Sequence, residues 1–408
     1  MKKSYFLFAS CLIGALFLSS CEKNLYDESK QPEKETHMTD LEVPSDFNWT
    51  SSQVAKMEII SQTATTAYVY LEPECTEDGL LLKMKIEPGT TPTLPLEIPA
   101  YVENVYVKYE GGTEVFTTPV NANGSISITV PASIKMSTAK AVTRADGKGN
   151  NDEYTPQPGT GDNALVYPGK GYATVMFEDM YPILGDYDFN DFVAWYKLQI
   201  PEFYHKGNEY FTNIMYIGFQ IRAIGGIYEY NPYIRLTDVR YDELNIEETE
   251  MYITRSNPTG NVKVLEGPNH EVIISYTKPA IPSGQKYLNV EADKKTTPED
   301  LIAVYLIFKS EINITRIQDS KIDIYLAKKN NGQEIHLKGY SPVYGPQQNY
   351  FDEKNFVWGL KTAAPIYHAT EGTNFLEAYP KFEKWVTSGG QQNRRWWNTK
   401  ENDLLIIN

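Results

Sequence analysis

The residues best suited to chemistry lie around one acidic loop. Six carboxylate or amide side chains fall within fourteen residues, namely Glu178, Asp179, Asp186, Asp188, Asn190 and Asp191. Three of them follow the spacing D-x-D-x-N, in which successive side-chain oxygens can point toward one hard cation, as in known calcium loops. Calcium takes roughly six to eight oxygen ligands. The sequence therefore predicts that these six residues bind a calcium ion.

The loop departs from the EF-hand pattern. The sixth position of that motif takes glycine and the twelfth takes glutamate, whereas this chain has Asp191 and Lys197. Aromatic neighbours such as Phe189 and Trp195 favour partial burial, where carboxylates repel one another strongly unless a counter-ion is present. Two alternatives stay open: a solvated turn with Asp and Asn capping backbone groups, and a carboxylate pair acting as acid and base on a glycosidic bond.

Other catalytic or metal motifs are missing from the sequence. Nucleophile elbows, phosphate-binding glycine loops and zinc-ligand spacings do not occur with their required context. The five histidines, at positions 37, 205, 270, 336 and 368, form no close pair, so zinc and copper are disfavoured. His336 is interpreted as a strand or surface residue rather than a general base. We expect a protein that is not an enzyme.

Aromatic residues gather near the C-terminus, at Tyr379, Trp385, Trp396 and Trp397. They could stack on a sugar ring, or plug the core beneath a helix without any ligand. Arg394 and Arg395 lie beside them. These two arginines could assist such binding or pair with surface acids.

The composition limits the class of protein. The chain has 408 residues, 41 % of them hydrophobic, which is enough for two or three domains and excludes a single small module. Its formal charge of −15 makes nucleic acid an unsuitable partner. Aromatics reach 13 %, with 30 tyrosines, a composition that suits half-buried strands. We predict a mainly β protein.

The N-terminus has the pattern of an export signal. Lys2 and Lys3 precede an apolar stretch that ends at Leu18-Ser19-Ser20-Cys21, with the length and charge order of a secretory signal. The last four residues resemble the bacterial lipobox. We predict a signal peptide over residues 1–20, lipidation of Cys21 and attachment to the outer membrane through that lipid.

The residues after Cys21 lack apolar periodicity. Residues 21–45 are predicted to form a lipidated polar tether. The charged stretch at its start, from Glu22 to Glu28, resembles the export signals of surface lipoproteins of Bacteroidetes-type bacteria. We expect display on the cell surface.

Two folded regions are predicted beyond the tether. Residues 46–134 alternate apolar and polar side chains in short runs separated by turn dipeptides such as Asn123-Gly124, the pattern of a small β-sandwich. Residues 135–166 are rich in Gly, Pro and polar residues and predict a flexible linker. A larger β-rich domain is predicted over 167–400, with a tail at 401–408.

One helical stripe stands out in the larger domain. Phe375, Tyr379, Phe382 and Val386 are spaced as one face of a C-terminal helix that a glycine pair ends. Pro380 lies inside this stripe, so the helix is expected to kink there or to begin there.

Three groups of residues resemble the motifs of one family in the same order along the chain. They are Phe177-Glu178-Asp179 with Gly185 to Val193, then Ile335 to Pro342, and last Glu377 to Trp385 with Ser388-Gly389-Gly390 and Trp396-Trp397. Residues 167–400 are thus similar to the LruC domain. This resemblance implies a bacterial, lipid-anchored envelope or surface protein, and it implies no enzyme.

Together these features predict a surface-anchored lipoprotein with a calcium-stabilised β-rich domain. Its expected role is non-catalytic binding or adhesion, with a glycan or a protein as ligand and no nucleic acid. A structural or accessory subunit of a surface appendage is the alternative, in which a partner completes an exposed strand edge. A carbohydrate-processing enzyme that uses the acidic loop is the weaker alternative.

Overall fold

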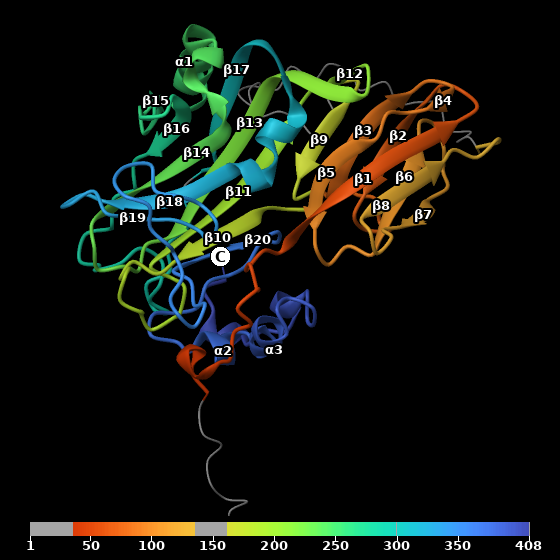
Figure 1. Cartoon of the computed structure of the whole chain (residues 1–408). Helices are drawn as coiled ribbons and strands as arrows, with labels where there is room; N and C mark the ends of the chain where they lie inside the picture. Colours follow the sequence, from red (N-terminus) through yellow and green to blue (C-terminus); the bar gives the residue numbers. More distant parts are fainter. Residues whose placement is uncertain (1–35, 135–160, 299, 408) are drawn as a thin grey trace, which may run out of the picture. The chain divides into compact units, whose positions relative to one another are not determined.

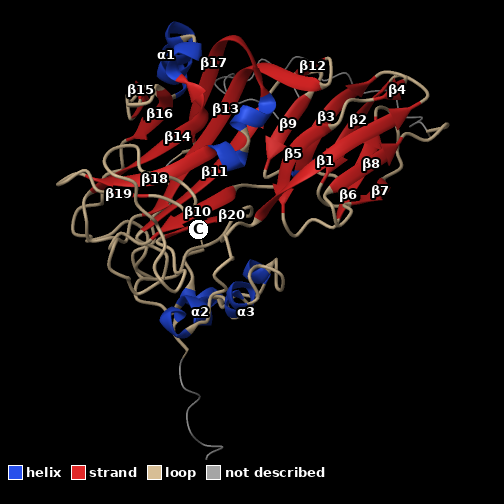
Figure 2. Cartoon of the chain, viewed as in Figure 1, coloured by secondary structure: helices blue, strands red, loops and turns tan. Residues whose placement is uncertain are grey.

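Most of the regular secondary structure consists of strands, many of which alternate apolar and polar residues. The computed structural model describes residues 36–134, 161–298 and 300–407. The predicted signal peptide, Cys21 and most of the predicted linker lie outside the described residues. Helices are few and short, as Figure 2 shows. The mainly β prediction is confirmed.

Two sheets face each other in the N-terminal part (Figure 1). The first contains β1 (Ser52–Ser61), β4 (Gly89–Thr90), β5 (Leu94–Pro99) and β8 (Ser125–Thr129). The second contains β2 (Thr65–Tyr70), β3 (Leu80–Ile86), β6 (Asn104–Tyr109) and β7 (Phe116–Pro119). Alternate residues of both sheets, Ile59 and Val107 among them, are buried in one core. The N-terminal part is therefore a β-sandwich, as the sequence predicted for its fold.

Strand β9 (Ala164–Tyr167) connects this sandwich to the rest of the chain. Its Leu165 pairs with Leu82 of β3, and its Tyr167 pairs with Leu198 of β11 (Phe192–Ile200). A single sheet of eleven strands therefore runs through both regions. The predicted linker ends in a strand, and residues 37–408 form one compact unit.

The larger region is a second sandwich. Its share of the long sheet consists of β10 (Ala173–Phe177), β11, β12 (Tyr204–Lys206), β13 (Glu209–Ala223), β17 (Ile302–Asn313) and β20 (Gly359–Thr362). The facing sheet has the order β15 (Val262–Glu266), β16 (Glu271–Tyr276), β14 (Tyr230–Arg240), β18 (Ile322–Lys328) and β19 (Glu334–Ile335). Aromatic pairs such as Phe219 and Tyr276, with ring centroids 4.6 Å apart, fill the space between the sheets.

A helix that the sequence did not reveal follows β14. Helix α1 (Ile246–Ser256) begins at Asn245, whose side chain accepts a hydrogen bond from the Glu248 backbone N–H. Only Thr249 and Ile253 of this helix are buried. Its apolar stripe is thus too thin to detect by periodicity.

The predicted C-terminal helix is divided in two at Pro380. Helix α2 (Phe375–Ala378) and helix α3 (Phe382–Thr387) flank it, because proline lacks the N–H needed inside a helix and disfavours helical backbone at the preceding residue. Short 3-10 helices cover Met38–Asp40, Glu77–Gly79, Tyr241–Glu243, Ile314–Ile317, Asp319–Lys321, Trp396–Asn398 and Asn402–Leu404. Among the described residues, no helix is long and apolar enough to cross a membrane.

A second hydrophobic core joins the two ends of the described chain. Helices α2 and α3 share it with Met38, Leu41 and Phe47, and Phe47 meets Trp385 edge-to-face at 5.0 Å. Asn355 donates to the backbone carbonyl of Pro44. The last part of the predicted polar tether is therefore packed against the folded body.

Candidate metal centre

Antiparallel pairing of β10 with β11 sets up the acidic loop. The last pair in this register joins Phe177 to Phe192. Glu178 and Asp191 flank that pair, so the two ends of the loop lie side by side. The Asp179 backbone N–H donates to Asp191 Oδ2 at 2.7 Å and closes the loop.

The loop folds around the Glu178 carboxylate. Tyr187 and Phe189 have left-handed backbones, with φ of 57° and 53°, and their N–H groups donate to Glu178 at 3.2 and 2.7 Å. Both rings are buried in the second core, where Phe189 meets Phe375 edge-to-face. A Cβ atom on Gly185 would lie 2.2 Å from Glu178 Oε2, so a larger residue here would displace that carboxylate.

Three carboxylates meet as a consequence. Oxygen atoms of Glu178, Asp186 and Asp188 all lie within 4.8 Å of one another. Glu178 is 0 % exposed and Asp188 is 2 % exposed, whereas Asp186 is exposed. A group of carboxylate oxygens in this arrangement could hold a metal ion.

Burial and mutual repulsion disfavour the charged forms of these groups. Burial, together with the charges of Asp191, Asp188 and Asp186, holds the pKa of Glu178 well above its ordinary value. Burial, and then Asp186, raise the pKa of Asp188 to about 8. Without a positive charge nearby, these carboxylates cannot all be ionised at neutral pH at low cost. A divalent cation would remove that repulsion.

Asn190 adds an oxygen that lacks a partner. Its Nδ2 donates to Asp188 Oδ2 at 2.7 Å and to the Ala369 carbonyl at 3.3 Å, which fixes the orientation of the amide. Its Oδ1 is buried and accepts no hydrogen bond from the described residues. Such orphaned acceptors cost about 1–3 kcal/mol and are rare in native proteins.

Asp179 and Asp191 do not belong to the group of three carboxylates. Asp179 Oδ2 accepts the Tyr228 backbone N–H at 2.8 Å. Burial raises the pKa of Asp179, while this hydrogen bond, Lys328 and Lys278 act against the rise. Burial and the charge of Asp179 raise the pKa of Asp191 to about 8. The structure thus brings Glu178, Asp186 and Asp188 together, places Asn190 and Asp191 against them, and turns Asp179 toward Tyr228.

A distant loop completes the surroundings of the site. The Gly372 N–H donates to Asp188 Oδ2 at 2.8 Å, and Ala369 accepts from Asn190. Burial, and then the charge of Asp186, raise the pKa of Glu371 in the same distant loop. These residues lie more than 170 positions after the acidic loop, and no local pattern marks them.

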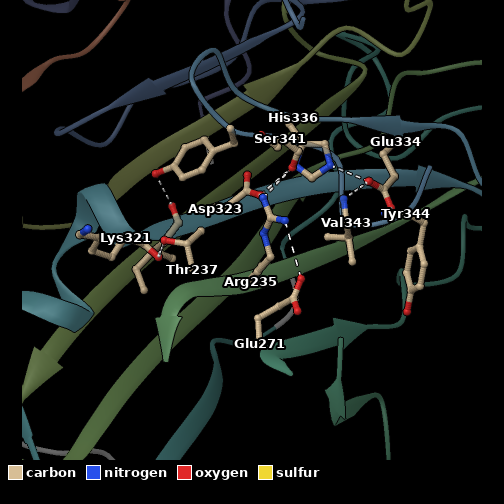
Figure 3. Close-up of polar contacts among 12 residues, drawn as sticks. Arg235, Thr237, Glu271, Lys321, Asp323, Glu334, His336, Ser341, Val343 and Tyr344 are labelled. Carbon is tan, nitrogen blue, oxygen red and sulfur yellow. Dashed lines mark hydrogen bonds and ion pairs between the residues drawn. The ribbon is translucent and has the colours of Figure 1, made fainter. Parts of the chain in front are cut away.

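A second cluster of charged groups, also unforeseen, lies on the five-stranded sheet (Figure 3). Arg235 pairs with Asp323 at 2.7 Å, and Asp323 also contacts His336 Nδ1 at 2.8 Å. His336 Nε2 contacts Glu334 at 2.9 Å. His336, interpreted from the sequence as a strand or surface residue, is fully buried.

This charged cluster forms hydrogen bonds with the backbone of the segment that follows β19. Glu334 accepts the Val343 N–H at 2.6 Å, and Arg235 donates to the Ser341 carbonyl at 2.6 Å (Figure 3). Burial alone would lower the pKa of His336, but Asp323 and Glu334 raise it above the ordinary value. The cluster is a structural support, because its carboxylate and imidazole groups are buried and paired with one another.

Most of the C-terminal aromatic residues are part of the core. Tyr379, Trp385 and Trp396 are buried there, and Trp396 contacts Phe382 at a centroid distance of 4.6 Å. Trp397 is only half-buried and meets Tyr101 edge-to-face at 5.5 Å. The three buried rings fill the core and offer no face to a sugar.

The fold and the site together define a β protein of two joined sandwiches, with a buried acidic group able to hold a metal ion. Residues 213–397 match the profile of a family described as "Domain of unknown function (DUF4842)". This range lies inside the region that resembles the LruC domain but leaves out the acidic loop. The comparisons do not name the LruC domain.

A solved structure from Bacteroides ovatus, described as "a Putative lipoprotein", has a similar fold. The likeness covers 84 % of this chain and 99 % of that chain, with a TM-score of 0.60 and 20 % sequence identity. No curated protein matches the chain. At this identity the likeness concerns the fold alone.

Proposed function

We propose that this protein is a lipoprotein of the outer membrane, displayed on the cell surface, that acts by binding and is stabilised by one calcium ion. The observation that carries the proposal is the convergence of Glu178, Asp186 and Asp188, whose carboxylate oxygens all lie within 4.8 Å of one another. An ion at this place would remove the repulsion among the carboxylates.

Calcium suits this donor set better than other metals. All the donors are carboxylate or amide oxygens, which favours a hard cation over zinc or copper. They come from the end of β10 and from the loop after it. Calcium tolerates such irregular geometry, whereas magnesium demands a near-ideal octahedron and gives up its waters reluctantly.

Thermal melting with metal titration tests the calcium site. The protein is stripped with a chelator and melted with increasing calcium or magnesium, and bound metal is counted by elemental analysis. We expect one calcium per chain and a rising midpoint, equivalent to about 2.7 kcal/mol at a hundredfold excess over Kd. An unchanged midpoint at millimolar calcium, with no bound metal, would contradict the proposal.

The lipid anchor is proposed at Cys21. Support comes from the apolar stretch and the Leu18-Ser19-Ser20-Cys21 sequence, and from the lipoprotein description of the structurally similar protein. Metabolic labelling with a clickable fatty acid should mark the wild type and not Cys21→Ser. Protease treatment of intact cells should remove the protein if it faces outward; full protection would place it on the inner side.

A binding role is proposed in preference to catalysis. Backbone N–H groups already engage Glu178 and Asp188, so these carboxylates are better placed as ligands than as acids or bases. Turnover of a glycan that Asp186→Asn abolishes without unfolding would instead establish an enzyme. Polymers that form with rising protein concentration would favour the appendage subunit.

A further inference from the structure

An open pocket of about 730 Å³ lies between the N-terminal sandwich and the segment after α3. Tyr101 and Tyr106 form part of its wall on one side. Gln391 and Asn393 line the other side, together with Arg394 and Arg395. The pocket is separate from the acidic loop and shares none of its residues.

Both arginines are held in place by uncharged partners. The Arg395 guanidinium lies 4.4 Å from the centre of the Tyr101 ring, and Trp397 supports that ring edge-on. Arg394 Nη1 donates to the Ala100 carbonyl at 3.2 Å, and Nη2 donates to Gln391 Oε1 at 3.3 Å. The two guanidinium groups are thus positioned before any ligand arrives, which lowers the entropy cost of binding.

These arginines have no acidic partner in the part of the chain that the structure describes, although acidic residues outnumber basic ones by 53 to 38. Glu103 lines the same pocket and makes no ion pair with either. By contrast, Arg316 pairs with Glu243 at 2.7 Å and Arg240 pairs with Asp242 at 3.1 Å. The pocket therefore presents positive charge that the described fold does not use.

We propose that this pocket binds an acidic sugar, that is, a saccharide ring carrying a carboxylate or a sulfate. The planar guanidinium groups match the oxygens of either anion in a bidentate manner. The side-chain amides of Gln391, Asn393 and Asn104 can bond ring hydroxyls, and the half-buried Tyr106 offers an aromatic surface to the ring. The inference rests on the proposed binding role and names its ligand class.

Isothermal titration calorimetry on the full mature chain, saturated with calcium, tests the pocket. The probes are trigalacturonate, a galactose oligosaccharide sulfated at C6, and uncharged galactotriose. We expect binding of at least one charged probe and no measurable heat with galactotriose. The two charged probes distinguish a carboxylate from a sulfate as the recognised group.

Arg394→Gln and Arg395→Gln should each weaken binding on the order of tenfold or more, because each removes a charge-assisted contact. Arg240→Gln removes an equal charge from outside the pocket and should leave the affinity unchanged. Both pocket arginines are exposed, so both variants should keep the wild-type melting midpoint. If one variant melts at a lower temperature, the affinity of the other variant tests the proposal.

Equal affinity for the neutral probe, or binding that survives the double variant, would overturn the proposal. Absence of binding to both charged probes would overturn it as well. The calcium-dependent rise in melting midpoint is a separate readout. If it persists while acidic sugars fail to bind, the inference falls and the calcium site stands.

Discussion

Glu178 accepts a hydrogen bond from the backbone N–H of Phe189 at 2.7 Å. This contact joins the end of β10 to a residue eleven positions later and holds Phe189 in a left-handed conformation. The Phe189 ring then enters the core against Phe375, while the adjacent Asp188 contributes to the acidic group. One buried carboxylate thus both shapes the loop and belongs to the candidate metal centre.

Asp188→Asn should affect stability differently with and without calcium. It removes one charge from a crowded group, but its amide NH2 replaces an oxygen that accepts hydrogen bonds from Asn190 or Gly372, so the metal-free midpoint should change little. With calcium, it should lose most of the stabilisation of about 2.7 kcal/mol expected at a hundredfold excess over Kd. Melting in chelator and in calcium measures both effects, with exposed Asp293→Asn as the charge-matched control. Equal calcium shifts in wild type and Asp188→Asn would refute this role.

Gly185→Ala should destabilise the protein by about 1–3 kcal/mol, because the added methyl group would lie 2.2 Å from Glu178 Oε2. It should also weaken calcium binding by displacing that carboxylate. Urea unfolding and calcium titration measure the two effects. Gly79→Ala is the matched control, since its added Cβ would have its nearest neighbour, Thr76 Oγ1, at 3.5 Å. Identical behaviour of the two variants would contradict the prediction.

His336→Gln should be most harmful at low pH. Asp323 and Glu334 raise the pKa of His336 above 6.5 despite its burial. The stabilisation from its charged form is therefore complete below pH 6.5 and is lost as the pH rises through the folded-state pKa. We expect a loss of about 3–5 kcal/mol at pH 5 and a smaller loss at pH 9.

Urea unfolding between pH 5 and pH 9 measures the free energy of unfolding of the wild type and of His336→Gln. The difference between the two should decrease as the pH rises. The exposed His205→Gln serves as the control and should show little difference from the wild type at any pH. A loss for His336→Gln that stays constant across this range would show that folding does not shift the pKa of His336, and a loss that grows with pH would show that the imidazole is neutral in the folded state.

Trp396→Ala should cost about 3–5 kcal/mol in stability, because this 0 % exposed ring fills the core between Tyr379 and Phe382. Trp397→Ala should cost less, since its side chain is only half-buried. Chemical denaturation compares the two. A Trp396→Ala variant of wild-type stability that fails to bind a sugar would point to a binding platform instead.

The sequence alone predicted the features that depend on neighbours along the chain. Strand β10 (Ala173–Phe177) lies in the region predicted to be β-rich, because that prediction depends only on which side chains can be buried. The D-x-D-x-N spacing of Asp186, Asp188 and Asn190 likewise placed the acidic group within one loop, and Pro380 marked the break between α2 and α3.

Only the tertiary structure decided the remaining features. Strand β9 merges two predicted domains into one sheet, Arg235 meets His336 through Asp323, and Gly372 reaches Asp188 across 184 positions. These contacts depend on strand register and on the packing of distant loops, which local periodicity does not encode. The sequence therefore predicted which residues could bind a cation, and the tertiary structure decided which of them lie together.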